Sequence, residues 1–320
     1  MIHRIALPLL ALAAAAAAQS TSTSTPAAAP SAQSRPPASP ALTSGAPPPI
    51  PPTATSTSDE TLTAAQREVL SRVLAEEFCY CGCPHTVAGC LREHKECKHA
   101  ARMASLAAHL AATGAPAAEV RRSLDEYYAG FDAAKRAKLD LASFGPPLGK
   151  PDARVAVVEF SDFTCPYCRA LKPELDRFVR EHQGRVRLYY KPYPIASHPR
   201  AVEAALAAEW ARDRGVFWKM YDLLFERQGE LADDDLAADA REVGGDPEDL
   251  LQALAAGRNR ARIAASQAEA RAAGLLGTPT LFFNGHRIQL PMAPQEAQAI
   301  LAFVLEDEEE WAQRGGWARD

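Results

Sequence analysis

The sequence predicts an α/β domain in the C-terminal half of the chain, preceded by a small all-α, cysteine-rich domain and by a disordered tether. Residues 155–160 form a continuous β-prone run of the kind found in a buried central strand. Residues 62–128 instead show helical periodicity around a group of five cysteines. Residues 19–58 are almost entirely Ser, Thr, Ala and Pro, which is typical of a segment without a packed core.

The length and net charge of the chain limit the kinds of protein that it can be. Its 320 residues suffice for two domains, and a hydrophobic content of 47% suits a packed core. The formal net charge is -5, so the chain lacks the basic excess of a nucleic-acid-binding protein. We therefore expect no nucleic-acid partner.

The N-terminus predicts a secretory signal peptide. Arg4 precedes an apolar run that extends to Ala18, and the small and polar residues there suit cleavage. An uncleaved anchor is the alternative, but the run is short for a bilayer span. We assign residues 1–18 to the signal peptide and residues 19–58 to an extended linker. The expected location is the periplasm or the exterior, where disulfides persist.

The helical, cysteine-rich domain is assigned to residues 59–144. Leu70 and Leu74 share helical spacing before the first cysteine, and a second helix is expected to stop near Gly114. A third helix is expected from Ala117 to Tyr128, because its apolar residues fall on one face.

The α/β domain is assigned to residues 150–305. After the central strand, a second strand is expected near residues 186–190. The pair Asn284-Gly285 predicts a hairpin between strands at residues 280–283 and 286–290. We expect the sheet to be parallel.

Helices complete this domain. A helical insertion is expected at about residues 200–273, with breaks at several glycines. The spacing of its aromatic residues predicts that they form the core of the insertion. A final helix is expected from Pro294 to Leu305, followed by an acidic tail at residues 306–320 that forms a solvated helix end. His198, just before the insertion, is expected to be a surface or capping residue, and a position near the active site is the alternative.

The motif Cys165-Pro166-Tyr167-Cys168 stands between the central strand and the next helix. Pro166 suits the first helical position, where a missing N–H costs nothing. The free N–H groups and the positive end of the helix dipole favour a thiolate at Cys165, which is therefore the predicted nucleophile. Cys168, one turn further, is placed to resolve a mixed disulfide. A structural disulfide or half of a zinc site is the alternative for an isolated CxxC motif.

Over about residues 155–305 the chain resembles the DsbA-like branch of the thioredoxin superfamily. The resemblance rests on residues 158–168, which end in the CPYC motif, and on Gly277-Thr278-Pro279 before a later strand. It implies a thioredoxin fold whose helical insertion is the extra subdomain of this branch. It also implies thiol–disulfide exchange by a redox-active Cys165–Cys168 disulfide, with no separate cofactor in this domain.

The resemblance extends to substrate binding. Pro279 matches the cis-proline that faces the active-site cysteines in the family, and the backbone of Thr278 would then be free to pair with an extended peptide. Pro166 and Tyr167, between the two cysteines, complete the predicted substrate-binding set. A trans proline at the start of an edge strand is the alternative for Pro279.

Glu159 lies on the central strand and matches the buried acid that the superfamily carries behind the resolving cysteine. A carboxyl group there could take the proton of Cys168, with a pKa raised by burial. The alternative is a carboxylate at a strand end, either solvated or paired with Lys191.

The cysteine cluster of the helical domain allows two chemistries. Its sulfurs could form two disulfides, leaving one cysteine free to exchange with the CPYC motif. As thiolates they could instead close a tetrahedral Zn²⁺ or Cu⁺ site. The predicted export favours disulfides. The candidate metal ligands are Cys79, Cys81, Cys83, Cys90, Cys97 and His99.

The helices around this cluster resemble the thiol domain of CcmH-type cytochrome c maturation proteins. The likeness lies in Leu74 to Cys79 and in the segment from Gly114 to Val120. That family uses a CxxC pair, whereas the spacing here is Cys-x-Cys-x-Cys, so haem handling is not carried over. What the resemblance implies is a second thiol module.

Together these features predict an exported thiol–disulfide oxidoreductase that acts mainly as an oxidase. Its expected partners are exported proteins with thiols or disulfides, together with a membrane redox partner that recycles it. A reductase or isomerase is the alternative within the class, because the direction depends on the reduction potential. A zinc- or copper-binding metallochaperone and a non-catalytic peptide-binding module are the alternatives from other classes.

Overall fold

A computed structural model describes residues 62–289 and 294–314 of the chain. The signal peptide and linker that the sequence predicts, residues 1–18 and 19–58, lie outside the described residues. In the described part, no helix has the length and the apolar character needed to cross a membrane.

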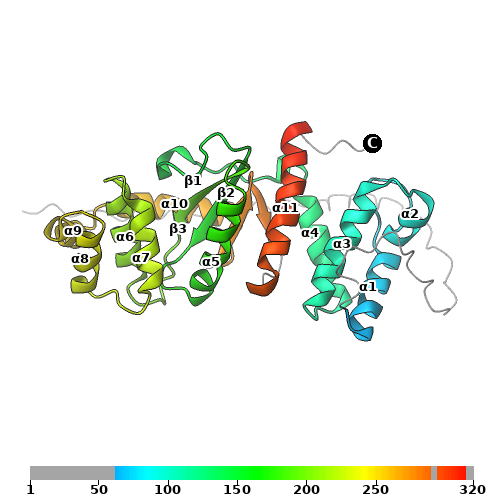
Figure 1. Cartoon of the computed structure of the whole chain (residues 1–320), viewed down its shortest axis with the longest axis horizontal. Helices are drawn as coiled ribbons and strands as arrows, with labels where there is room; N and C mark the ends of the chain where they lie inside the picture. The colour runs from blue at the N-terminus through cyan, green and yellow to red at the C-terminus, as the bar shows by residue number, and fades with distance from the viewer. Residues whose placement is uncertain (1–61, 290–293, 315–320) are drawn as a thin grey trace, which may run out of the picture. The chain divides into compact units, whose positions relative to one another are not determined.

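The cysteine-rich region is helical, as predicted (Figure 1). Its three predicted helices are confirmed, and a short helix that the sequence did not predict, α2, stands between the first two. Thr63 begins the first helix with a capping box, in which its side chain and that of Gln66 each accept a backbone N–H of the other residue. The bounds are α1 Ala64–Glu76, α2 Val87–Glu93, α3 Lys98–Ala112 and α4 Ala117–Ala129.

Five strands of the described residues form one sheet in the order β1-β3-β2-β4-β5. Only β2 and β3 pair in parallel, so the expectation of a parallel sheet is wrong. The chain returns from the insertion antiparallel to β2 and then reverses again at Asn284-Gly285, where both residues have positive φ, as a tight hairpin requires. The bounds are β1 Leu148–Gly149, β2 Val155–Ser161, β3 Val186–Pro192, β4 Thr280–Phe283 and β5 His286–Ile288.

The predicted α/β fold with a helical insertion is confirmed. One long helix follows β2, five helices fill the described chain between β3 and β4, and a last helix follows β5. The insertion breaks near glycines, as predicted, and Gly215, Gly244 and Gly257 have positive φ. The bounds are α5 Pro166–Glu181, α6 Ala201–Arg212, α7 Phe217–Glu226, α8 Asp233–Glu242, α9 Pro247–Ala255, α10 Arg260–Ala272 and α11 Pro294–Arg314, with 3-10 turns at Ala133–Lys135 and Ala142–Phe144.

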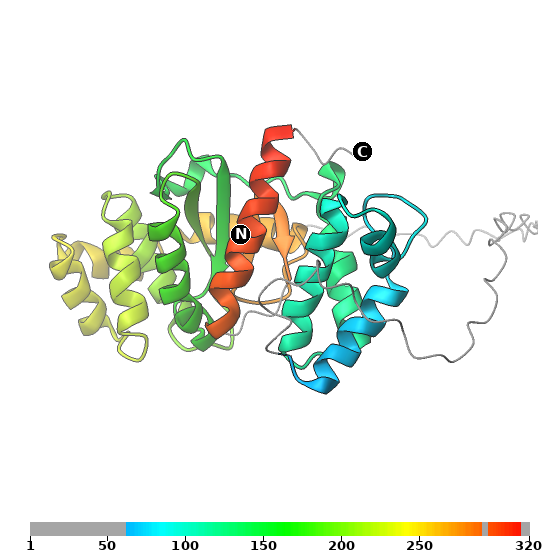
Figure 2. The same ribbon diagram turned by 45° about the vertical axis from the view of Figure 1, so that its right-hand side comes forward.

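Alternate residues of β2 face opposite layers of the domain. Val155 and Val157 belong to the core that includes α5 and α11, which lie against the sheet (Figure 2). Ala156 and Val158 instead pack with Ala270 of α10 on the other face. Because side chains alternate along a strand, Glu159 points to the same side as Val157, toward the helix that carries the CPYC motif.

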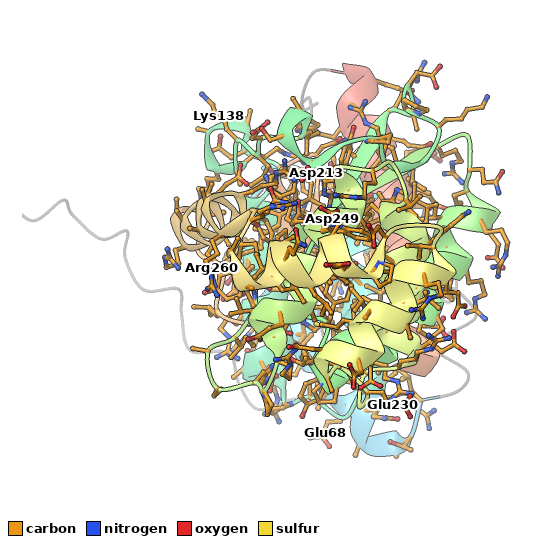
Figure 3. All side chains as sticks on the ribbon, turned by 90° about the vertical axis from the view of Figure 1, so that its left-hand side faces the viewer. Glu68, Lys138, Asp213, Glu230, Asp249 and Arg260 are labelled. Atoms are coloured by element: carbon orange, nitrogen blue, oxygen red, sulfur yellow. The ribbon has the colours of Figure 1, made fainter. Side chains whose placement is uncertain are left out.

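A half-buried and an exposed aspartate join helices of the insertion. Asp249 of α9 accepts a hydrogen bond from the indole N–H of Trp210 at 2.7 Å, which ties α9 to α6. Asp213, at the end of α6, accepts from Arg262 and Asn259 at the start of α10, at 2.9 and 2.8 Å. Figure 3 shows Asp213 and Asp249 near each other on the outer side of the insertion.

The acidic run that the sequence sets apart as a solvated tail is part of α11. Asp307 is 1% exposed and Glu308 is 0% exposed. Asp307 pairs with Arg102 of α3 and accepts a hydrogen bond from Tyr127 of α4 at 2.7 Å. The expectation was wrong because Arg102 pairs with the buried carboxylate of Asp307 and Tyr127 donates a hydrogen bond to it.

Candidate active site

Cys165 lies at the junction of β2 and α5, where the chain places it as the residue that caps the helix. Pro166 occupies the first helical position, as predicted, so its lack of an N–H removes no hydrogen bond. Cys165 is 3% exposed and Cys168 is 0% exposed, which makes Cys165 the outer sulfur. All seven cysteines are free thiols in the structure, so the disulfide of the CPYC motif stays a prediction.

The two cysteines have opposite acidities. The pKa of Cys165 is lowered to about 5, chiefly by a hydrogen bond from the thiol of Cys168. The N–H groups of Cys168 and Tyr167 and the hydroxyl of Thr278 lower it further. Burial, the same hydrogen bond and the charge of Glu159 raise the pKa of Cys168. At neutral pH the reduced site therefore holds one thiolate, at Cys165.

Pro279 faces this thiolate from the other side of the site. The Thr278–Pro279 peptide bond is cis, which confirms that part of the prediction. The sulfur of Cys165 lies 3.5 Å from the carbonyl oxygen of Thr278. Residues widely separated in the sequence thus meet at one sulfur.

The surface around Cys165 is partly apolar. Tyr167 is 74% exposed, and Leu276, just before the Gly277-Thr278-Pro279 segment, is 91% exposed. Tyr167 is two residues after Cys165 in the chain, and Leu276 is two residues before Thr278, whose carbonyl oxygen lies 3.5 Å from the sulfur of Cys165. Exposed apolar side chains beside a reactive group suit contact with an unfolded polypeptide.

Glu159 is fully buried, and burial raises its pKa to about 7. Its Oε2 accepts a hydrogen bond from the hydroxyl of Tyr221 at 3.3 Å, while its Oε1 has no hydrogen-bond partner. Lys191 instead pairs with Glu269, so the alternative pairing of Glu159 with Lys191 is wrong. Tyr221, predicted only as insertion core, is therefore also part of the site.

Asp162 fixes the loop that leads into the motif. It is 1% exposed, and one of its oxygens accepts from the N–H and the hydroxyl of Thr164, both at 2.8 Å. The other oxygen accepts from the N–H of Ile195 at 2.9 Å and lies 2.8 Å from Nδ1 of His198. His198, although 27% exposed, is thus a partner of the active-site loop, which is the alternative that the sequence left open.

The insertion also reaches the motif directly. Gln228, between α7 and α8, donates hydrogen bonds from Nε2 to the carbonyl oxygens of Phe163 and Cys165, at 2.7 and 2.9 Å. No sequence pattern marks Gln228, because its role depends on contacts with residues more than sixty positions away.

The cysteines of the helical region converge in two groups. The sulfurs of Cys79, Cys81, Cys90 and Cys97 all lie within 4.8 Å of one another. A second group, with ligand atoms equally close together, consists of Cys83, His85 and His94. Neither group includes His99, so the structure does not support His99 as a ligand. His94 of the second group is a residue that the sequence did not single out.

The comparisons with known proteins concern about half of the chain. A family model described as thioredoxin matches residues 144–302. The chain is similar to oxidised BdbD from Bacillus subtilis, with 24% identity, 55% of this chain and 97% of that chain covered, and a TM-score of 0.49. It is also similar to a thioredoxin-like oxidoreductase from Silicibacter pomeroyi, with 30% identity, 59% and 97% covered, and a TM-score of 0.45.

Among curated proteins the chain is similar to parts of Na⁺/H⁺ antiporters named NhaA. It is 39% identical over 140 residues to one from Salinispora arenicola, a match that spans 43% of this chain and 21% of that protein. It is 37% identical over 158 residues to one from Salinispora tropica, spanning 49% of this chain and 24% of that protein. The chain therefore spans less than a quarter of the length of these relatives.

Proposed function

The chain belongs to the thioredoxin superfamily through its DsbA-like residues 144–302, and from this membership we propose that it is an exported thiol–disulfide oxidoreductase. Cys165 and Cys168 exchange disulfides with extracytoplasmic proteins, with the oxidase direction preferred. The supporting observation is the lowered pKa of Cys165 beside a cis Pro279. Ion transport is not part of the proposal, because the matches cover only 21% and 24% of the two antiporters.

The reaction in the oxidase direction is a pair of thiol–disulfide exchanges. A substrate thiolate attacks Cys165 in the Cys165–Cys168 disulfide, so a mixed disulfide forms and the sulfur of Cys168 leaves. A second substrate thiolate then attacks the substrate sulfur of that bond and releases Cys165 as a thiolate. Two electrons pass from the substrate to the domain. Of the two protons that the substrate thiols lose, Cys168 keeps one and the solvent takes the other, because Cys165 stays a thiolate. A disulfide-bearing membrane partner then takes the two electrons from the domain.

The acidity of Cys165 supports this direction. A thiolate with a pKa of about 5 is a good leaving group, and its stability favours the reduced form of the pair at neutral pH. A pair whose reduced form is stabilised accepts electrons readily, so its disulfide oxidises other proteins. The apolar surface at Tyr167 and Leu276 and the backbone of Thr278 are the proposed substrate contacts.

Incubation with a reduced, unfolded protein tests this function. We expect the oxidised chain to form disulfides in the substrate stoichiometrically, and catalytically when glutathione disulfide is supplied. Equilibration with glutathione should give a reduction potential nearer about -120 mV than about -270 mV. A potential near the lower value, with no transfer of disulfides to the substrate, would contradict the oxidase direction and favour a reductase.

Glu159 is the proposed proton carrier for Cys168. It lies on the face of β2 that looks toward α5, and its charge contributes to the raised pKa of Cys168. With a pKa of about 7 it can give a proton to the departing sulfur of Cys168 and take it back in the reverse step.

A Glu159→Gln variant should be slower but more stable. We expect formation and opening of the Cys165–Cys168 disulfide to slow by about two orders of magnitude. Because folding raises the pKa of Glu159 from 4.5 to about 7, the folded state binds its proton more tightly, and stability falls as pH rises between those values. Above pH 7 the variant should therefore gain about 3 kcal/mol, measured by denaturant unfolding.

The exposed Glu181 of α5 provides the control, since Glu181→Gln should change neither rate nor stability. If Glu159→Gln exchanged disulfides at the wild-type rate, Glu159 would not be the proton carrier. The roles assigned to the two cysteines would be unaffected.

A further inference from the structure

We propose that Cys79, Cys81, Cys90 and Cys97 bind one Zn²⁺ ion in a tetrahedral site of four thiolates. This site lies outside the CPYC motif, and the proposal does not depend on the function of Cys165. The observation that supports it is that four sulfurs, from one turn and two helices, lie within 4.8 Å of one another.

The distances between the sulfurs fit a single ion. A Zn–S bond of about 2.3 Å in a tetrahedron places its sulfurs roughly 3.8 Å apart. The sulfurs of Cys79 and Cys97 lie 3.8 Å apart, and those of Cys81 and Cys90 lie 3.9 Å apart. The whole set is compact enough to surround one ion with a closed shell of protein ligands, as structural zinc sites require.

The backbone brings these residues together from three elements. Cys79 begins the turn after α1 and Cys81 lies within it, and the turn ends at Gly82, whose φ of +84° other residues rarely adopt. Cys90 lies within α2, and Cys97 caps the N-terminus of α3. An ion held by all four would join the turn, a helix of only seven residues and the start of α3.

The choice of metal follows from the ligand type and number. Four thiolates in a tetrahedron are typical of zinc, and the positive end of α3 beside Cys97 favours the net negative charge of such a complex. Two disulfides, Cys79–Cys97 and Cys81–Cys90, are the competing use of the same sulfurs. Disulfides bring sulfurs together in pairs and do not require that both pairs converge on one point, as they do here.

Cys83 supplies a matched control. It follows the same turn and is half-buried like Cys81, and its sulfur lies 3.2 Å from that of Cys81 and 3.7 Å from that of Cys90. It nevertheless belongs to the other group, with His85 and His94. A bound ion would also keep the four ligand thiols from exchanging with the CPYC motif, because a coordinated thiolate is a poor nucleophile toward disulfides.

The test is the metal content of the full chain, purified under reducing conditions without chelators and measured by inductively coupled plasma mass spectrometry. We expect one zinc per chain, retained in Cys83→Ser and in the Cys165→Ser, Cys168→Ser double variant. Cys81→Ser and Cys90→Ser should lose it. Co²⁺ in place of zinc should give the visible bands of a tetrahedral thiolate complex and a sulfur-to-metal charge-transfer band.

A second measurement does not depend on how the variants fold. Titration of the wild-type chain with an organomercurial should release the zinc, detected with a chromophoric chelator, as the four thiols react. The proposal is overturned if the reduced wild-type chain binds no zinc or if Cys83→Ser loses the ion while Cys81→Ser keeps it. It is also overturned if the chain isolated from the export compartment carries both disulfides instead of the metal.

Discussion

A Cys168→Ser variant should accumulate as mixed disulfides between Cys165 and other proteins. Cys165 keeps the helix N-terminus and the hydroxyl of Thr278, so it stays nucleophilic, but no second sulfur is left to resolve the intermediate. We expect turnover to fall to the background of uncatalysed exchange. The adducts should appear as bands of higher mass on non-reducing gels and disappear on reduction.

The Cys165→Ser variant is the matched control. It removes the outer sulfur, so we expect the same loss of turnover with no adducts, because Cys168 is 0% exposed and has a raised pKa. Adducts that form equally well on Cys168 would reverse the assigned roles of the two sulfurs.

A Glu308→Gln variant should lose about 3–5 kcal/mol of stability, the typical cost of leaving a buried charge without its partner. Glu308 is 0% exposed, and its two oxygens accept hydrogen bonds from Arg136 at 2.6 and 2.9 Å. Nδ1 of His286 lies 2.8 Å from the same carboxylate. The variant leaves Arg136 buried and uncompensated, and denaturant unfolding should show the loss.

The neighbouring Glu309 gives the contrast within one helix. It pairs with Arg185 at 2.7 Å, but Arg185 is 42% exposed, so Glu309→Gln should cost at most about 1 kcal/mol. Equal effects of the two substitutions would show that Glu308 contributes no more than a surface pair.

Much of the fold follows from local sequence signals. The apolar run of β2, the Asn284-Gly285 hairpin and the glycines of the insertion each act through neighbouring residues, and the structure bears them out. The cis state of Pro279 followed from a family resemblance rather than from base rates, which favour the trans form. Features that depend on neighbouring residues can therefore be predicted from the sequence.

The features that were missed depend on distant partners or on very short elements. Strand β1 has two residues and α2 has seven, too few to show a period. Tyr221 is hydrogen-bonded to Glu159, 62 positions away in the sequence, and Arg136 is hydrogen-bonded to Glu308, 172 positions away. In the sequence alone, an acidic run is expected to be solvated. The buried arginine that pairs with it comes from a distant part of the chain, so no local pattern predicts the pairing.

Titration of the thiolate at Cys165 tests the central claim most directly. The ultraviolet absorbance of the reduced chain, taken as the difference between wild type and Cys165→Ser, should rise with a midpoint near pH 5, matching a pKa of about 5. The rate of alkylation of Cys165 should follow the same curve. A midpoint near the ordinary thiol value of 9.0 would contradict the account, because the site would then hold no reactive thiolate at neutral pH.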